Sequence, residues 1–154
     1  MTATVSEARD AMMSTFRTAW LADAETLAIP VKWPDVAQGE FPPKTQDADG
    51  NPTPWARIVV LHNPGAGGQG NLSGDTGQRR YERFGNVIIS LFAGVGGGMA
   101  KLDEMTRVAM QAFEGVRHTA TGVVFLRVRP QEVGQDGTYT QVNVLADFEY
   151  DEVR

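Results

Sequence analysis

RRYERFGNVIISLFAGVGGGMAKLDEMTRVAMQAFEG, residues 79–115, is the stretch that decides the fold. Its charged start gives way to the apolar run Val87–Phe92, which predicts a long strand whose second half is buried. Glycines follow at Gly94–Gly98, and apolar residues then recur at helical spacing up to Gly115, where a left-handed cap belongs. The stretch therefore predicts a strand, a tight turn and an amphipathic helix over about 98–114.

The flanking segments predict the rest of an α+β fold. Thr4-Val5-Ser6-Glu7 matches a capping box and opens an apolar helical pattern over about 5–24. Strands that alternate between polar and apolar residues typically leave one sheet face open, so we expect a mainly antiparallel sheet with two main helices packed on it. Further strands are predicted at three full segments and one short edge segment: Trp55–His62, Val123–Arg129, Thr138–Tyr150 and Ile29–Pro34.

Two details of the last strands are also predicted. Pro130 lacks a backbone donor and should end the strand before it. Asp136-Gly137 signals a turn, but under this assignment the connection is too long for a two-residue hairpin. Val142, Val144, Ala146, Phe148 and Tyr150 should share the buried face of the final strand, whereas Asp147 and its acidic neighbours should form a solvated outer row and tail.

Composition restricts the classes of function. The 154 residues suit one domain, residues 1–154, with flexible loops expected at 35–54 and 63–78. The chain has no cysteine and two histidines, which excludes thiol catalysis, disulfides and a His-rich metal site. A net charge of −5 argues against broad attraction to nucleic acid. The opening residues do not form a secretory signal and no apolar run is long enough to span a membrane, so we expect a soluble protein made in the cytosol.

Two glycine motifs suggest nucleotide binding at first sight. Gly65–Gly70 matches GxGxxG after a strand, but no helix start follows it, so we interpret it as a flexible loop. Gly94–Gly98 does precede a helix, yet Met99 replaces the third glycine of the fingerprint. A crossover that needs positive φ explains these glycines better, and an anion- or nucleotide-binding enzyme that uses Gly94–Gly98 is the less favoured reading. We expect no catalytic residues, no cofactor and no metal; the calcium-like Asp47–Ile58 lacks the required glycine and glutamate.

The only basic concentration consists of Arg79, Arg80 and Arg83, with Tyr81 interleaved. Three interpretations of this cluster stay open. It could belong to a solvated strand whose positive charge is balanced by Glu82 and Asp75, or it could contact a protein or a nucleic acid. The segment is too polar for a core and too regular for a loop, which suggests a strand that projects beyond its sheet and contacts another subunit. We therefore predict an oligomer or partner interface at six residues: Asn71, Leu72, Arg79, Arg80, Tyr81 and Arg83.

The chain resembles a known family over nearly its whole length. The phrases RRYERFGNVIISLFAGVGGG, KLDEMTRVAMQAFEG, TGVVFLRVRPQEVGQDGTY and TQVNVLADFEYDEV, with the segment Trp33-Pro34-Asp35, are similar to the small tail-terminator, or tail-completion, proteins of long-tailed bacteriophages. The resemblance lies in the order of elements and in short phrases, not in a catalytic motif.

The resemblance implies a ring-forming α+β subunit, usually a hexamer, without enzymatic activity. Such a ring caps the tail tube, ends its growth and provides the joining surface for the head-side connector. The implied partners are further copies of the chain, the major tail tube protein and the head–tail connector, with DNA only passing through the channel and no membrane contact. The implied location is the neck end of the virion tail, after assembly in the host cytoplasm. A head–tail connector or minor tail protein is the alternative.

Overall fold

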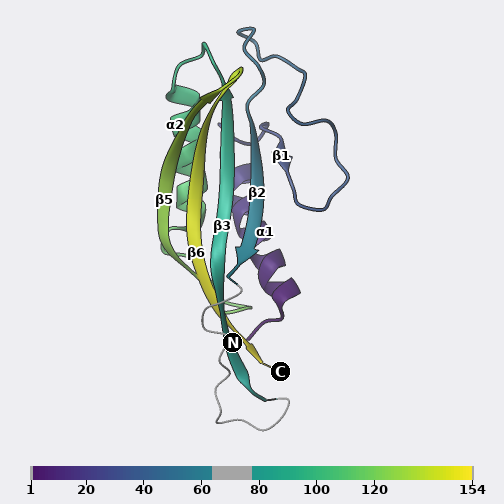
Figure 1. Cartoon of the computed structure of the whole chain (residues 1–154), viewed down its shortest axis with the longest axis vertical. Helices are drawn as coiled ribbons and strands as arrows, with labels where there is room; N and C mark the ends of the chain where they lie inside the picture. Colours follow the sequence, from purple (N-terminus) through teal and green to yellow (C-terminus); the bar gives the residue numbers. More distant parts are fainter. Residues whose placement is uncertain (1, 64–77, 154) are drawn as a thin grey trace.

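The computed structural model describes residues 2–63 and 78–153 as a curled sheet with two helices on one of its faces (Figure 1). The strand order is β1-β2-β3-β6-β5-β4, and every neighbouring pair is antiparallel except β1 with β2. The expected α+β class with a mainly antiparallel sheet is confirmed. The elements are α1 Val5–Ala22, β1 Val31–Lys32, β2 Trp55–His62, β3 Arg80–Gly94, α2 Ala100–Phe113, β4 Arg117–His118, β5 Val123–Asp136 and β6 Tyr139–Val153.

Both helices begin or end where the sequence predicts. The Glu7 amide donates to the Thr4 hydroxyl at 3.2 Å, and the Thr4 amide donates back to the Glu7 carboxylate at 2.8 Å, so the capping box is confirmed. The hydrogen bond from the Thr4 amide lowers the pKa of the Glu7 carboxyl group. At the other end of the pattern, α2 stops before Gly115, whose φ of +67° confirms the left-handed cap position.

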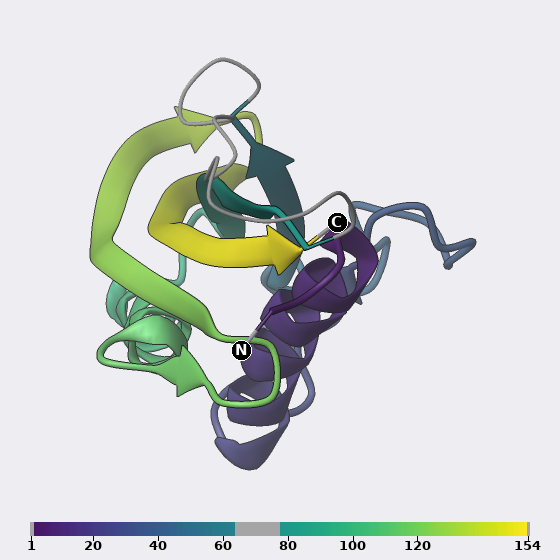
Figure 2. The same ribbon diagram turned by 90° about the horizontal axis from the view of Figure 1, so that it is seen from below.

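The core fills the space between the helices and the covered face of the sheet. Phe16 of α1 stacks on Phe113 of α2 with 6.4 Å between ring centroids, and Phe113 meets Phe125 of β5 at 4.7 Å. The predicted apolar face of β6 is confirmed, because Val142, Val144, Ala146, Phe148 and Tyr150 are all buried. Figure 2 shows the curl of the sheet from below, with β5 sweeping around in a wide arc.

The prediction that Pro130 ends a strand is wrong. β5 continues to Asp136, with Pro130 opposite Val144 of β6. A proline is tolerated there because β4 pairs only with Val123 and Val124, which leaves this half of β5 at the edge of the sheet. The prediction of a long connection is also wrong: Asp136 pairs with Tyr139, so a two-residue turn joins β5 to β6.

The segments on either side of β2 were predicted to be a short edge strand and two loops. The expected short edge strand is confirmed as β1, which pairs with Ala56 and Arg57 only. Residues 35–54 contain neither helix nor strand apart from an isolated bridge between Gln46 and Pro52, and their expected mobility stays a prediction. The motif Gly65–Gly70 lies outside the described residues. No helix within the described ranges is long and apolar enough to cross a membrane.

Candidate functional site

A two-stranded ribbon extends the sheet at the end where the chain termini lie. β2 ends opposite Gly85, whereas β3 and β6 remain paired to Arg80 and Val153 (Figure 1). The first residues of β3 therefore project beyond β2, as the sequence predicted. The backbone of Ala3 donates to the carbonyl of Asp151 at 3.0 Å, so the segment before α1 borders the β6 side of the ribbon.

The arginines of this ribbon have partners within the chain. Arg83 Nε lies 2.8 Å from a Glu152 carboxylate oxygen, and Arg80 lies 3.5 Å from Asp151. These ion pairs form with β6 rather than with Glu82, since the ladder places the end of β6 directly opposite, and Asp75 lies outside the described residues. Arg79 is exposed and precedes the strand.

The other predicted interface residues occupy different positions. Arg83 also lies over the Tyr81 ring, at 5.7 Å from its centroid, so Tyr81 belongs to the same ribbon cluster. Asn71 and Leu72 lie outside the described residues. The structure brings Tyr81 and Arg83 together, whereas Arg80 lies on the other face of the strand beside Asp151; the role of these residues in an interface stays a prediction.

A histidine–tyrosine pair lies at the base of the ribbon on the helix side. His62 Nε2 is 2.8 Å from the Tyr150 hydroxyl, and the two rings meet edge to face. Burial lowers the pKa of His62, and the nearby Arg9 and Arg83 lower it further. Burial, with a smaller contribution from Glu152, raises the pKa of Tyr150 to about 12. The pair is therefore neutral near pH 7, and neither group is prepared to act as a nucleophile.

The opposite face of the sheet contains a charged cluster that the sequence did not predict. Asp147 is only 7% exposed and forms ion pairs with Arg127 at 2.7 Å and Arg129 at 3.2 Å. It also accepts a hydrogen bond from Asn86 of β3. The expectation that Asp147 belongs to a solvated row is wrong, because a bulge between Leu126 and Arg129 brings both arginines over its carboxylate.

The glycine turn between β3 and α2 is explained by its backbone. Gly96 and Gly98 have φ of +107° and +74°, which confirms the crossover interpretation. A Cβ on Gly94 would lie 2.7 Å from Pro52 Cδ, so glycine is also needed there for close packing. The turn borders a cavity of about 480 Å³ that is lined by Asp47 and Asp49.

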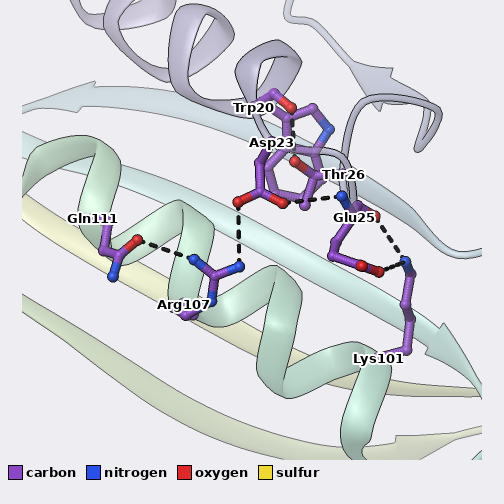
Figure 3. Close-up of polar contacts among 7 residues, drawn as sticks. All are labelled: Trp20, Asp23, Glu25, Thr26, Lys101, Arg107 and Gln111. Atoms are coloured by element: carbon purple, nitrogen blue, oxygen red, sulfur yellow. Dashed lines mark hydrogen bonds and ion pairs between the residues drawn. The ribbon is translucent and has the colours of Figure 1, made fainter.

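The cation at this turn is already engaged (Figure 3). Lys101 donates to the Glu25 carbonyl at 2.7 Å and lies 3.7 Å from its carboxylate. Arg107, six residues further along α2, pairs with Asp23 at 3.2 Å, while the Glu25 amide and Arg107 lower the pKa of Asp23. These contacts join the loop after α1 to α2 and leave acids around the turn, which does not suit an anion.

The acidic residues also form no metal site. Asp47 Oδ1 accepts the amides of Asp49 and Asn51 at 3.0 and 2.9 Å, so this carboxylate stabilises a turn. Within residues 2–63 and 78–153, no group of three His, Asp or Glu side chains could hold a metal ion.

Both side edges of the sheet are open over most of their length. On one side, β1 covers only Ala56 and Arg57 of β2, which leaves 58–62 without a strand neighbour in the described part of the chain. On the other side, β5 has no outer strand neighbour among the described residues beyond Phe125, whose amide donates to the Val116 carbonyl, and every residue of 129–136 is exposed. Open edges present unpaired backbone donors and acceptors, which readily pair with another strand.

A groove of about 730 Å³ runs beside the open edge of β2. Its apolar lining includes Met13, Trp33, Val36 and Val59, and Val36 is 58% exposed. Charged residues of α1 and of the segment after β1 border it: Arg9, Asp10, Arg17 and Asp35. Sequence reasoning missed this groove because its walls come from three separate segments.

Comparison with known proteins yields a fold but not a family. No protein-family model matches the chain, and no curated protein matches it. One similar solved structure has a TM-score of 0.59 and 14% sequence identity. The likeness covers 92% of this chain and 94% of the other. At this identity it shows that the fold recurs, and it carries no statement about function.

Proposed function

We propose that this chain is the subunit of a ring that caps the tail tube of a long-tailed bacteriophage, ends its growth and offers a joining surface to the head-side connector. The observation that carries the proposal is the pair of open edges on one sheet. β2 and β5 differ in sequence, so an edge-to-edge contact between copies is head-to-tail. Repeated head-to-tail contacts close into a ring when the rotation between copies permits it.

The projecting ribbon gives further support. Its β3 strand extends beyond β2, and the exposed Arg79 and Arg80 lie at the far end. A projecting ribbon can reach the next copy or the tube. Because Arg80 and Arg83 are already paired with Asp151 and Glu152, a contact at the ribbon depends most on Arg79.

The sheet face without helices is a suitable surface for the tail tube protein. Leu61 and Leu126 on β2 and β5 are 51% and 40% exposed, and Arg127 is also exposed. Mixed apolar and charged surfaces of this kind are typical of non-obligate interfaces. DNA only passes through the channel of the proposed ring, which agrees with the net charge of −5. The proposed place is the neck end of the tail, with assembly in the host cytoplasm.

The proposal can be tested by mass and by microscopy. We expect native mass measurement to detect a concentration-dependent species of about six subunits. We expect a gold-labelled chain to mark one end of isolated tails in electron micrographs. A chain that stays monomeric at high concentration, both alone and with tail tubes, would contradict the proposal. Saturable nucleotide binding that is lost in Gly96→Val would instead favour an enzyme or nucleotide-binding protein.

A further inference from the structure

We propose that the outer half of β5, residues 130–136, adds as a strand to the groove beside the open edge of β2 in the neighbouring copy. This inference rests on the proposed ring function and names the two surfaces that would form its subunit contact. The groove supplies an unpaired β2 edge at 58–62 with apolar side chains beside it. The outer half of β5 is extended, exposed and unpaired on its outer side. Strand addition satisfies the backbone groups of both edges at once.

Shape and apolarity fit this arrangement. Val133 is the extra residue of a bulge between Glu132 and Gly134, and it is 52% exposed at the edge of β5. The groove is lined by Met13, Val36 and Val59, among other residues. A bulge re-aims the side chain of the extra residue, which makes Val133 the apolar residue best placed to enter the groove.

Charge favours contact between two different edges over contact between like edges. The only charged residues of 130–136 are Glu132 and Asp136, and neither forms an ion pair with a described residue. Arg9 and Arg17 border the groove and have no ion-pair partner among the described residues either. Pairing β5 with β5 would bring four acids together without a cation, whereas the groove beside β2 is bordered by two arginines as well as by Asp10 and Asp35. Charge thus disfavours contact between like edges and favours the head-to-tail contact that a ring needs.

The ladder also fixes how neighbouring copies are displaced. Pro130 is level with Ile58, through Val144 of β6 and Ile89 of β3. Residues 130–136 therefore lie toward one end of the sheet, whereas 58–62 lie toward the other. When residues 130–136 of one copy pair with 58–62 of the next, the two copies are displaced along the strand direction. The strands of the ring are then inclined to the ring axis, as in a closed sheet with shear.

Cysteine cross-linking tests the contact directly, because the chain has no cysteine of its own. We expect a mixture of Val133→Cys and Val36→Cys proteins to give cross-linked dimers with a short thiol cross-linker, and the double variant to give a ladder up to the closed ring. Each single variant alone should give no cross-link. A cross-link in Val133→Cys alone would indicate β5–β5 pairing and would overturn the inference, as would uncross-linked rings in the mixture.

Charge reversal gives a second, independent test. Arg9→Glu with Arg17→Glu, or Glu132→Lys with Asp136→Lys, should each weaken ring formation by at least about tenfold. Combining both pairs should restore assembly to within about threefold of the original chain, which a merely structural role would not do. Glu104→Lys on α2, away from the groove, is the matched control and should leave ring formation unchanged. Circular dichroism should confirm that each variant is folded.

The outcomes separate this inference from the proposed function. Rings that form normally in both charge-reversed variants would overturn the edge-to-groove contact and leave the terminator proposal standing. A wild-type chain that forms no ring, with or without tail tubes, would overturn the terminator proposal and this contact with it.

Discussion

Arg127 gives the most direct test of how the open edge of β5 is built. It has φ of +44°, in the left-handed region that costs a residue with a side chain about 1–2 kcal/mol. Its ion pair with Asp147 is 2.7 Å long, but the Arg127 side chain is 80% exposed, so the pair contributes about 0–1 kcal/mol. Backbone strain and the ion pair therefore oppose each other at one residue.

Replacing Arg127 by alanine or by glycine separates the two contributions. Both variants lose the ion pair, but only glycine relieves the strain, at a cost of about 0.5–1 kcal/mol in unfolded-state entropy. We expect Arg127→Gly to be more stable than Arg127→Ala by about 0.5–1 kcal/mol. In a chain of this size, where 1 kcal/mol shifts Tm by about 2–4 °C, that difference corresponds to about 1–4 °C in Tm.

The measurement is urea unfolding followed by tryptophan fluorescence, since the chain has three tryptophans. Gln131, four residues along the same exposed strand, has no positive φ and serves as the control position. There the order should reverse, with alanine more stable than glycine by about 0.5–1 kcal/mol. If Arg127→Ala equals or exceeds Arg127→Gly in stability, the assignment of strain to this bulge is wrong.

Three further predictions concern the rest of the site. The free energy of unfolding should fall as the pH drops through 6.5, because the pKa of His62 is lowered in the folded state and the unfolded state therefore binds more protons there. Urea unfolding at several pH values measures this fall, which should be smaller in His62→Gln. Gly94→Ala should lower stability by about 1–3 kcal/mol, because the added Cβ meets the backbone of Pro52, whereas Gly39→Ala, which meets nothing within 4 Å, should be nearly neutral; thermal unfolding distinguishes them. Arg83→Ala should lower the free energy of unfolding, measured in urea, by about 1 kcal/mol, because its half-buried ion pair with Glu152 is lost. Arg79→Ala should change it by less than about 0.5 kcal/mol, and equal effects of the two variants would contradict the assigned pairing.

Local signals in the sequence predicted the parts of the fold that local chemistry determines. The capping box at Thr4 needs only residues within one helical turn, and its two hydrogen bonds are present. The alternation along β6 reflects one strand with one buried face, which period-two spacing records directly. Gly96 and Gly98 needed positive φ for the crossover, and both have it. In each case the cause and the signal lie within the same few residues.

The predictions that failed depend on position in the sheet, which a local pattern does not contain. Pro130 ends a central strand but not an edge strand, and only the sheet order places β5 near an edge. Asp147 alternates like a solvated residue, yet its carboxylate is covered by Arg127 and Arg129, which come from a strand that begins more than twenty residues earlier in the chain. The bulge that brings both arginines to Asp147 could not be predicted from the sequence. Its positive φ lies at Arg127, and arginine, unlike glycine, does not indicate such a conformation.

The same reasoning moves the proposed subunit contact from the ribbon to the edges. The sequence marked the arginines of residues 79–83 as an interface because they are concentrated, but Arg80 and Arg83 already have acidic partners on β6. A charge paired within the chain gains little from a second partner. The open edge of β5, in contrast, combines Pro130 with two register irregularities, and these are features that proteins use to prevent unspecific strand pairing. Such an edge can pair only with a surface that suits its shape, and we propose that this surface is the groove beside β2, which offers an open strand edge, apolar residues and two arginines.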